Sequence, residues 1–348
     1  MPLLKRVRLL PAILAFVAVT DAGAQNPFRH IFPFQRESSQ REQPARSRQT
    51  SRPTRSQDSN RSSSAASVSS SSSSSTSTPK ATGSAIGRPS VISTPGRYVL
   101  SGNLNAQENA TTAAVVITAP NVTLDLGGYT IRSRGSGSPD NCGVAVLADS
   151  VLIRNGVISG FAGENQCGVL VAAGVRNFVL EDVRLNDCET GILLNPENDL
   201  NHPVESARIS RCSITSGSIG ILAFPTLGLT VDSSTVSGCV PRRDVEGEGS
   251  GAVLRGQAVT VRNSSFTSCT DGLRLEADSS LLVETACVGN LETGCIVSGN
   301  ATLVQRCSFS GNRGDGLSIA AEAVQVESSL ASFNGGNGVV LEEIAGGG

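Results

Sequence analysis

Two carboxylates, Asp187 and Glu189, flank Cys188 in the segment NDCET, and the pair Arg242 and Arg243 begins a charged loop downstream. Carboxylates beside arginine could abstract a proton from a sugar ring with the help of Ca²⁺, and two carboxylates alone could serve as acid and base in glycoside hydrolysis. Nearby loops offer further polar groups for holding a sugar, namely Glu164, Asn165, Asp244, Glu246 and Glu248. These residues form a candidate catalytic site, but we favour the alternative of solvated polar loops, because the usual companions of such chemistry are missing from the sequence.

Whether these residues can lie close together in space depends on a repeat in the sequence. A glycine followed by alternating apolar residues recurs nine times, and the last four intervals are 21, 22, 22 and 22 residues. The nine glycines are Gly143, Gly168, Gly191, Gly220, Gly251, Gly272, Gly294, Gly316 and Gly338. Each unit is too small to bury its own apolar face, so the units must stack, with parallel strands ~4.8 Å apart. Short, β-branched strands without helical periodicity favour a β-solenoid over a leucine-rich horseshoe.

A second short strand in each unit predicts an internal column of apolar side chains. The expected column is Leu124, Ile153, Leu180, Ile209, Val231, Val261, Val283, Val304 and Val326. The residues that follow them should face outward, and these are Asp125, Arg154, Glu181, Ser210, Asp232, Arg262, Glu284, Gln305 and Glu327. Acids and arginines alternate along much of this outer column, so stacked neighbours attract and fix the register.

The segments GRYVLSGNL (96–104) and VVITAPNVTLDLGGYTI (115–131), followed by the nine units, resemble right-handed parallel β-helix repeat proteins of the pectate-lyase-like superfamily. The resemblance covers about residues 89–348 and implies an all-β, right-handed parallel β-helix of about nine coils. The superfamily includes lyases, hydrolases, epimerases and non-catalytic surface proteins, so the resemblance specifies the fold and leaves the activity open.

The triplet TDG at Asp271 is similar to a motif of polygalacturonase-like hydrolases, whose acid and base are paired carboxylates. Those enzymes also need a histidine-bearing turn and an Arg-x-Lys. The predicted domain contains one histidine, His202, and no lysine after Lys80. Asp315 occupies the same place in a later unit, and aspartate before glycine suits a tight turn. We therefore interpret Asp271 as a turn residue.

Coil length varies in only part of the repeat. Units one, two and five carry long insertions before the glycine, whereas units three and four are short there. Long loops around short turns predict a recess about two coils wide, roughly 10 Å, which suits one or two sugar rings. Its floor should be NDCET (186–190) and TSGSI (215–219), with the charged loops as walls.

All nine cysteines lie in the repeat. Their spacing has no zinc-site pattern, so no metal is expected from them, and Ca²⁺ is the one cation that the acidic loops could use. Cys142 stacks on Cys167 and Cys239 on Cys269, which suits either strained disulfides or a ladder of buried thiols.

Residues 1–24 read as a secretory signal peptide, with basic residues before a short apolar stretch and a small-residue cleavage site. Residues 25–88 form an Arg/Ser-rich linker, expected to be disordered, with ten basic and three acidic residues. Residues 89–348 carry 15 arginines against 26 acids. We expect a secreted, periplasmic or cell-surface protein without a transmembrane segment after the signal peptide. Its basic linker either contacts an anionic surface or only keeps the protein soluble.

Two functions remain open from the sequence. One is interaction with an extracellular or cell-envelope polysaccharide, with lyase or hydrolase activity as a possible extension. The other is a non-catalytic surface, matrix or adhesion protein. The acidic body and an aromatic content of 3% argue against nucleic acid as a partner, and the oligomeric state stays open.

Overall fold

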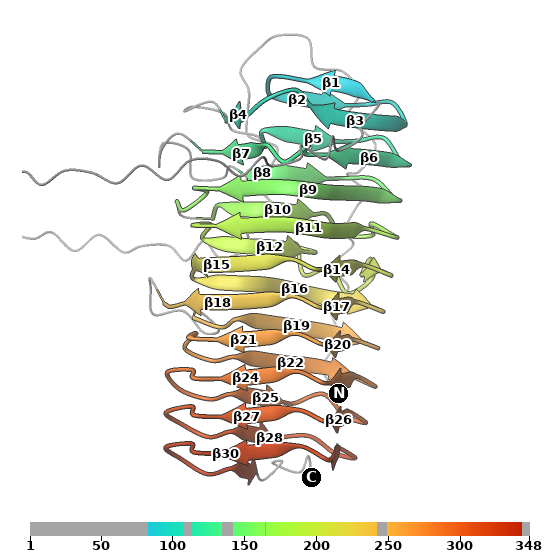
Figure 1. Ribbon diagram of the computed structural model, residues 1–348. Coiled ribbons are helices and arrows are strands. Elements are labelled where there is room, and N and C mark those ends of the chain that lie inside the picture. Colours follow the sequence, from blue (N-terminus) through green and yellow to red (C-terminus); the bar gives the residue numbers. More distant parts are fainter. Residues whose placement is uncertain (1–82, 107–112, 134–141, 164, 242–248, 343–348) are drawn as a thin grey trace, which may run out of the picture.

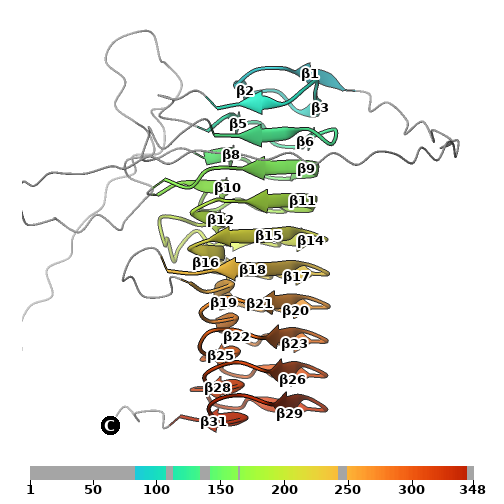
Figure 2. The same ribbon diagram turned by 60° about the vertical axis from the view of Figure 1, so that its left-hand side comes forward.

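The computed structural model describes residues 83–106, 113–133, 142–163, 165–241 and 249–342. These residues form one column of stacked coils that runs from N-terminal to C-terminal units (Figures 1 and 2). Their regular elements are all β-strands, with no helix among them, and successive coils pair in parallel. The described ranges contain no helix that is long and apolar enough to span a membrane.

One face of the column is a 12-stranded sheet. In order along the column, its strands are β2 (Ser90–Ile92), β5 (Val115–Ile117), β8 (Cys142–Val146), β10 (Cys167–Val171), β12 (Thr190–Leu194), β16 (Ile219–Leu227), β19 (Ala252–Gln257), β22 (Leu273–Asp278), β25 (Cys295–Val297), β28 (Leu317–Ile319) and β31 (Val339–Leu341). A short strand, β13 (Val204–Glu205), pairs with the end of β16.

A 19-stranded sheet supplies two further rows, which the long strands β9 (Val151–Ser159) and β11 (Val179–Asn186) join. The first row contains β1 (Ser84–Ile86), β3 (Gly96–Leu100), β6 (Val122–Asp125), β14 (Arg208–Ser210), β17 (Thr230–Asp232), β20 (Thr260–Arg262), β23 (Leu281–Val283), β26 (Leu303–Gln305) and β29 (Gln325–Glu327). The second contains β4 (Leu104–Asn105), β7 (Thr130–Arg132), β15 (Ser213–Gly217), β18 (Thr235–Cys239), β21 (Ser265–Thr267), β24 (Ala286–Val288), β27 (Ser308–Ser310) and β30 (Leu330–Ser332).

The repeated glycines stand where the backbones of successive coils approach closely. A Cβ placed on Gly220 would lie within 3.0 Å of the Gly251 carbonyl oxygen, and a Cβ on Gly251 would collide in the same way with Gly272. The same contact links each glycine from Gly143 to its successor along the column. Backbone approach, rather than turn conformation, therefore explains why glycine recurs here.

The predicted internal column is confirmed from Leu124 to Val304 except at one position, and Val326, which is in register in the last coil, is 42% exposed. Ile209 pairs with Val231 and Val231 with Val261, and all three are fully buried. The next residue in the column is Leu282, so the prediction of Val283 was wrong. Three consecutive apolar residues in LLVET leave the alternation ambiguous by one residue, and such a slip moves every side chain to the other face.

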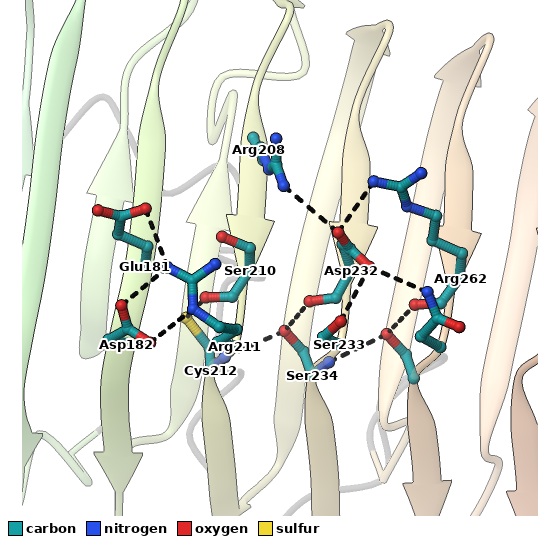
Figure 3. A network of polar contacts seen from close by, with 12 residues as sticks. Glu181, Asp182, Arg208, Ser210, Arg211, Cys212, Asp232, Ser233, Ser234 and Arg262 are labelled. Atoms are coloured by element: carbon teal, nitrogen blue, oxygen red, sulfur yellow. Dashed lines mark hydrogen bonds and ion pairs between the residues drawn. The ribbon is translucent and has the colours of Figure 1, made fainter.

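Ion pairs along the outer column join neighbouring coils. Asp125 accepts from Arg97 at 3.2 Å and from Arg154 at 3.1 Å, and Asp232 contacts Arg208 at 3.3 Å and Arg262 at 3.0 Å (Figure 3). The Asp125–Arg154 and Asp232–Arg262 pairs are those that the alternation predicted, whereas Arg97 and Arg208 come from positions outside the predicted column.

Because the register at LLVET differs by one residue from the prediction, Glu284 does not stand in the outer column where it was predicted. Val283 occupies the outer column, between Arg262 and Gln305. Glu284 stands one residue later, in a left-handed turn with φ of 48°, where Arg306 Nε donates to it at 2.9 Å.

A buried amide ladder links the last three coils. Asn312 Oδ1 accepts from the backbone N–H and the side-chain amide of Asn290, each at 3.0 Å. Asn334 Oδ1 accepts in the same way from Asn312, at 3.0 and 3.1 Å. The ladder begins at Cys269, whose backbone N–H donates to Asn290 Oδ1. The amides satisfy turn N–H groups that face the interior.

All nine cysteines are buried free thiols. Cys142 and Cys167 pair across β8 and β10, as their spacing predicted. Burial raises the pKa of the Cys167 and Cys287 thiols well above the ordinary range. The structure thus matches the thiol-ladder alternative.

Candidate functional site

The predicted floor of the recess consists of two segments on adjacent coils, the turn after β11 and the junction of β15 and β16, and these segments contact each other directly. Strand β11 ends at Asn186, and its Oδ1 accepts from Thr215 Oγ1 of β15 at 2.7 Å. Gly217, with φ of +120°, lies so close to the Cys188 carbonyl that no Cβ would fit. The close approach fixes the position of Asp187 and Glu189 relative to the second segment.

Asp187 is the exposed carboxylate of this edge. Its φ of 53° is left-handed, a conformation that aspartate and asparagine tolerate better than most residues. Its backbone N–H donates to the Thr215 carbonyl at 3.2 Å. Asn186 and Thr215 are half-buried beside it. The edge thus presents a carboxylate, an amide and a hydroxyl, three groups that can hydrogen-bond sugar hydroxyls.

Glu189 lies two residues further on and is 5% exposed. Ser218 Oγ donates to Glu189 Oε1 at 3.2 Å, and the Ser218 N–H donates to the Glu189 carbonyl at 2.8 Å. The Glu189 N–H in turn bonds to the Phe161 carbonyl at 2.7 Å, so three coils hold this residue. One carboxylate, Asp187, is therefore exposed, whereas the other, Glu189, is buried and held by hydrogen bonds.

The structure describes only some of the predicted walls. Asn165 is half-buried, with a left-handed φ of 56°. Glu164, Arg242, Arg243, Asp244, Glu246 and Glu248 lie outside the described residues. The predicted pairing of Asp187 and Glu189 with the two arginines thus stays a prediction.

Gly217 and Ser218 belong to the predicted floor segment TSGSI (215–219), but the sequence assigned neither of them a role of its own. Within the described ranges, no group of three or more His, Cys, Asp or Glu residues is arranged to hold a metal ion.

Asp271 joins two coils, in keeping with its interpretation as a turn residue. Its Oδ1 accepts from the Thr293 N–H of the next coil at 3.2 Å, and its Oδ2 lies 3.5 Å from Arg274 Nη1. Asp315 makes the equivalent contact with the Asn337 N–H at 2.6 Å. Both carboxylates thus accept hydrogen bonds from turn N–H groups 22 residues later in the chain.

Comparison with known proteins identifies the fold. Residues 204–345 match the family model described as "Right handed beta helix region". The matched coils continue the same parallel stack as the preceding ones, so the described residues have the parallel β-helix fold that the sequence predicted. No curated protein sequence matches the chain.

Two solved structures illustrate the likeness. The A-module of a mannuronan C-5 epimerase from Azotobacter vinelandii is 13% identical, with a TM-score of 0.52 over 71% of this chain and 70% of that one. A mutant of a periplasmic alginate epimerase is 12% identical, with a TM-score of 0.50 over 71% and 67%. At these identities the likeness establishes the shared fold.

Proposed function

We propose that this right-handed parallel β-helix protein binds a polysaccharide outside the cytoplasm, at the edge formed by Asn186, Asp187 and Thr215. The observation that carries the proposal is the row of hydrogen-bonding groups on two adjacent coils, which the Gly217 contact holds in place. Coils ~4.8 Å apart repeat on a scale close to that of sugar rings in a chain. A polysaccharide along the column could therefore engage successive coils.

The comparisons support the ligand class by analogy. The two solved structures described above are named as epimerases of mannuronan or alginate, which are polysaccharides, and one of them is named as periplasmic. Together with the predicted signal peptide, this favours a role in the cell envelope or outside the cell.

Charge favours neutral glycans in the absence of divalent cations. Residues 89–348 carry 11 more acidic than basic residues, and Asp187 adds a negative charge at the edge. A polyanion such as alginate would be repelled, unless Ca²⁺ bridged the two sets of carboxylates. We therefore propose Ca²⁺ as a condition for binding acidic glycans, and no cation for neutral ones.

Catalytic activity on the bound glycan is a more specific proposal than binding. Glu189 is buried and fixed, whereas Asp187 is exposed, so the two carboxylates have environments different enough for separate acid and base roles. Arg242 and Arg243 complete the predicted set. A non-catalytic adhesion or matrix protein is the second candidate, because the aspartates of the outer column form ion pairs that join coils.

Binding to a panel of neutral and acidic glycans, with and without Ca²⁺, tests the proposal. Asp187→Asn removes the charge and keeps a residue that tolerates a left-handed φ, so binding should weaken by at least tenfold while the melting temperature stays unchanged. Asp182→Asn is the charge control, because Asp182 is an exposed aspartate with φ of 55° on β11, which ends just before Asp187. Since Asp182 also forms an ion pair with Arg211, its melting temperature is measured as well. Equal affinity of both variants and wild type would refute the site.

Product analysis separates the two candidates. If the protein is an enzyme, incubation with a bound glycan should release unsaturated or reducing ends, and Glu189→Gln should abolish this release while binding persists. Binding without any product would favour the adhesion or matrix role.

A further inference from the structure

The second row of strands carries polar side chains along its outer surface. The strands of this row follow one another along one face of the column (Figure 1). Their core residues, such as Ile214, Val236 and Phe266, are at most 1% exposed, and the residue after each core residue faces outward. From β4 to β21 these outward residues pair in register, and they are Asn105, Arg132, Ser159, Asn186, Thr215, Ser237 and Thr267. We call these seven residues the polar track.

The polar track ends where the chemistry of the outward position changes. After Thr267, this position holds Val288 of β24. Hydroxyl groups return in the next two coils, but there they bind each other, because Ser310 Oγ lies 3.1 Å from Ser332 Oγ and 3.3 Å from Ser308 Oγ. The polar track thus extends from β4 to β21, about 29 Å along the column.

Most hydroxyl groups on this face have no partner within the protein. Strands β15, β18 and β21 each contribute a second outward hydroxyl, two residues before the one in the polar track. Within the described ranges, the hydroxyls without a side-chain hydrogen bond are those of Ser159, Ser213, Thr235, Ser237, Ser265 and Thr267. Thr235 is exposed and the other five are half-buried, so a ligand can reach them.

The first row provides an internal comparison. Its outward side chains bind each other across coils, as Asp125 does with Arg154 and Asp232 with Arg262. These pairs join neighbouring coils, which explains why the outward positions of the first row are charged. The free hydroxyls of the second row form no such links, so stacking of the coils does not explain them.

The chemistry of this face fits a neutral glycan. All six outward residues of β15, β18 and β21 that belong to this face are Ser or Thr, and a hydroxyl can both donate and accept, as sugar hydroxyls do. Arg132 is the single charged residue of the polar track, and its Nε donates to Asn105 Oδ1 at 2.9 Å. The hydroxyls form a grid with spacings of about 4.8 Å along the column and about 6.6 Å along each strand.

We infer that a linear neutral glycan lies along the polar track, with its long axis parallel to the column and about one sugar ring on each coil. The inference rests on the proposed function, because Asn186 and Thr215 belong both to the proposed edge and to the polar track. It specifies the ligand further, since the edge alone contacts one or two sugars whereas the polar track contacts a longer chain. Affinity should therefore depend on glycan length.

A series of glycans of increasing length tests the inference. The probes are cello-oligosaccharides, β-1,4-linked manno-oligosaccharides and β-1,3-linked gluco-oligosaccharides of two to ten sugars, titrated by calorimetry without Ca²⁺. Affinity for at least one series should rise up to about seven sugars and then level off. An affinity that is constant beyond three sugars would overturn the polar track and leave the proposed edge in place. Binding of acidic glycans alone, in the presence of Ca²⁺, would have the same consequence.

A pair of matched variants tests which face holds the glycan. Thr235→Val combined with Thr267→Val removes two free hydroxyls, and it should weaken binding of the seven-sugar probe by at least fivefold. Thr230→Val combined with Thr260→Val is the control, because these half-buried threonines face outward from β17 and β20 of the same two coils. The control should bind as wild type does, and all variants should keep the wild-type melting temperature.

The outcomes separate this inference from the proposed function. Wild-type affinity of the Thr235→Val/Thr267→Val protein, together with weaker binding by Asp187→Asn, would overturn the polar track alone. Wild-type affinity of both proteins would overturn the polar track and the proposed edge together. Equal weakening by the control pair would also overturn the polar track, since hydroxyls on either face would then matter equally.

Extension of the polar track provides a test that impaired folding cannot imitate. Val288→Thr places a hydroxyl in the coil after Thr267, so the affinity for probes of eight or more sugars should rise at least twofold. The affinity for a four-sugar probe should increase less. An unchanged length dependence in Val288→Thr would overturn the inferred direction of the glycan.

Discussion

Substitution of Asn312 by alanine should destabilise the column far more than its small size suggests. Asn312 is 2% exposed, and its Oδ1 accepts two hydrogen bonds from Asn290. Its side-chain amide donates to the Cys287 carbonyl at 3.1 Å and to Asn334 Oδ1 at 3.1 Å. Alanine would remove four hydrogen bonds in the interior of the turn and leave two buried donors of Asn290 without an acceptor.

The magnitude follows from the cost of unsatisfied donors. Each buried donor left unpaired costs about 1–3 kcal/mol, and the carbonyl groups lose a partner at smaller cost. Adding the small cavity, we expect Asn312→Ala to lower the free energy of unfolding by about 3–5 kcal/mol. Asn300→Ala is the control, because Asn300 Oδ1 accepts from the exposed Glu322 N–H, which water can satisfy instead. Its cost should be about 0.5–1 kcal/mol.

Urea unfolding followed by far-ultraviolet circular dichroism measures both variants against wild type, with the slope checked for a change in cooperativity. If Asn312→Ala proves no more costly than Asn300→Ala, the amide ladder does not stabilise the C-terminal coils, and the reasoning from buried donors is refuted.

Three further predictions concern charge, close packing and the basic segment. Burial alone would raise the pKa of Asp125, but the Gly127 N–H, Asn155 and Arg154 bind its carboxylate and hold the pKa below the usual value. The stability that ionised Asp125 contributes is therefore fully present above about pH 4, and it is lost as the pH falls through the lowered pKa of Asp125 in the folded protein. Asp125→Asn should therefore reduce the loss of stability at acidic pH. Gly220→Ala places a Cβ against backbone and should prevent folding or lower the melting temperature by more than 10 °C, roughly what 3 kcal/mol implies, whereas Gly102→Ala, with open space, should not. Deletion of residues 25–82 should weaken retention on anionic envelopes at low salt and leave the melting temperature of the column unchanged, and equal retention would exclude attachment through this segment.

Most of the fold could be predicted because the repeat combines two independent signals. Glycines at near-constant spacing mark where backbones approach, and alternating apolar residues mark which side faces inward. The error at Val283 arose where these signals were weakest, in three consecutive apolar residues. Strand β1 begins at Ser84, within the stretch assigned to the linker, because SAI is too short to give a periodic signal.

The candidate site was harder to predict because insertions carry no periodicity. Asp187 and Glu189 could be placed on one edge from the alignment of units three and four. Their different exposure depends on the approach of Gly217 to Cys188 and on the Ser218 contact, which sequence spacing does not encode. The sequence did not distinguish the outward-facing Leu170 and Leu193 from core residues, because strands that are apolar on both faces do not show which side chains face inward.

One turn column shows how coil length and side-chain chemistry depend on each other. The position in contact with the repeated glycine holds Phe161, Cys188, Cys239 and Cys269 in the earlier coils, and Asn290, Asn312 and Asn334 in the last three. An amide ladder requires each residue to align with its neighbour within hydrogen-bond distance, and only the coils of constant length maintain that alignment. Thiol and phenyl groups pack without directional bonds, so they tolerate insertions in the adjacent loops. The variable coils could thus acquire charged loops around Asp187, while the constant coils stabilise the column. On this argument, a two-residue insertion beside Asn312 should cost several times more stability than the same insertion beside Cys239, and equal costs would contradict it.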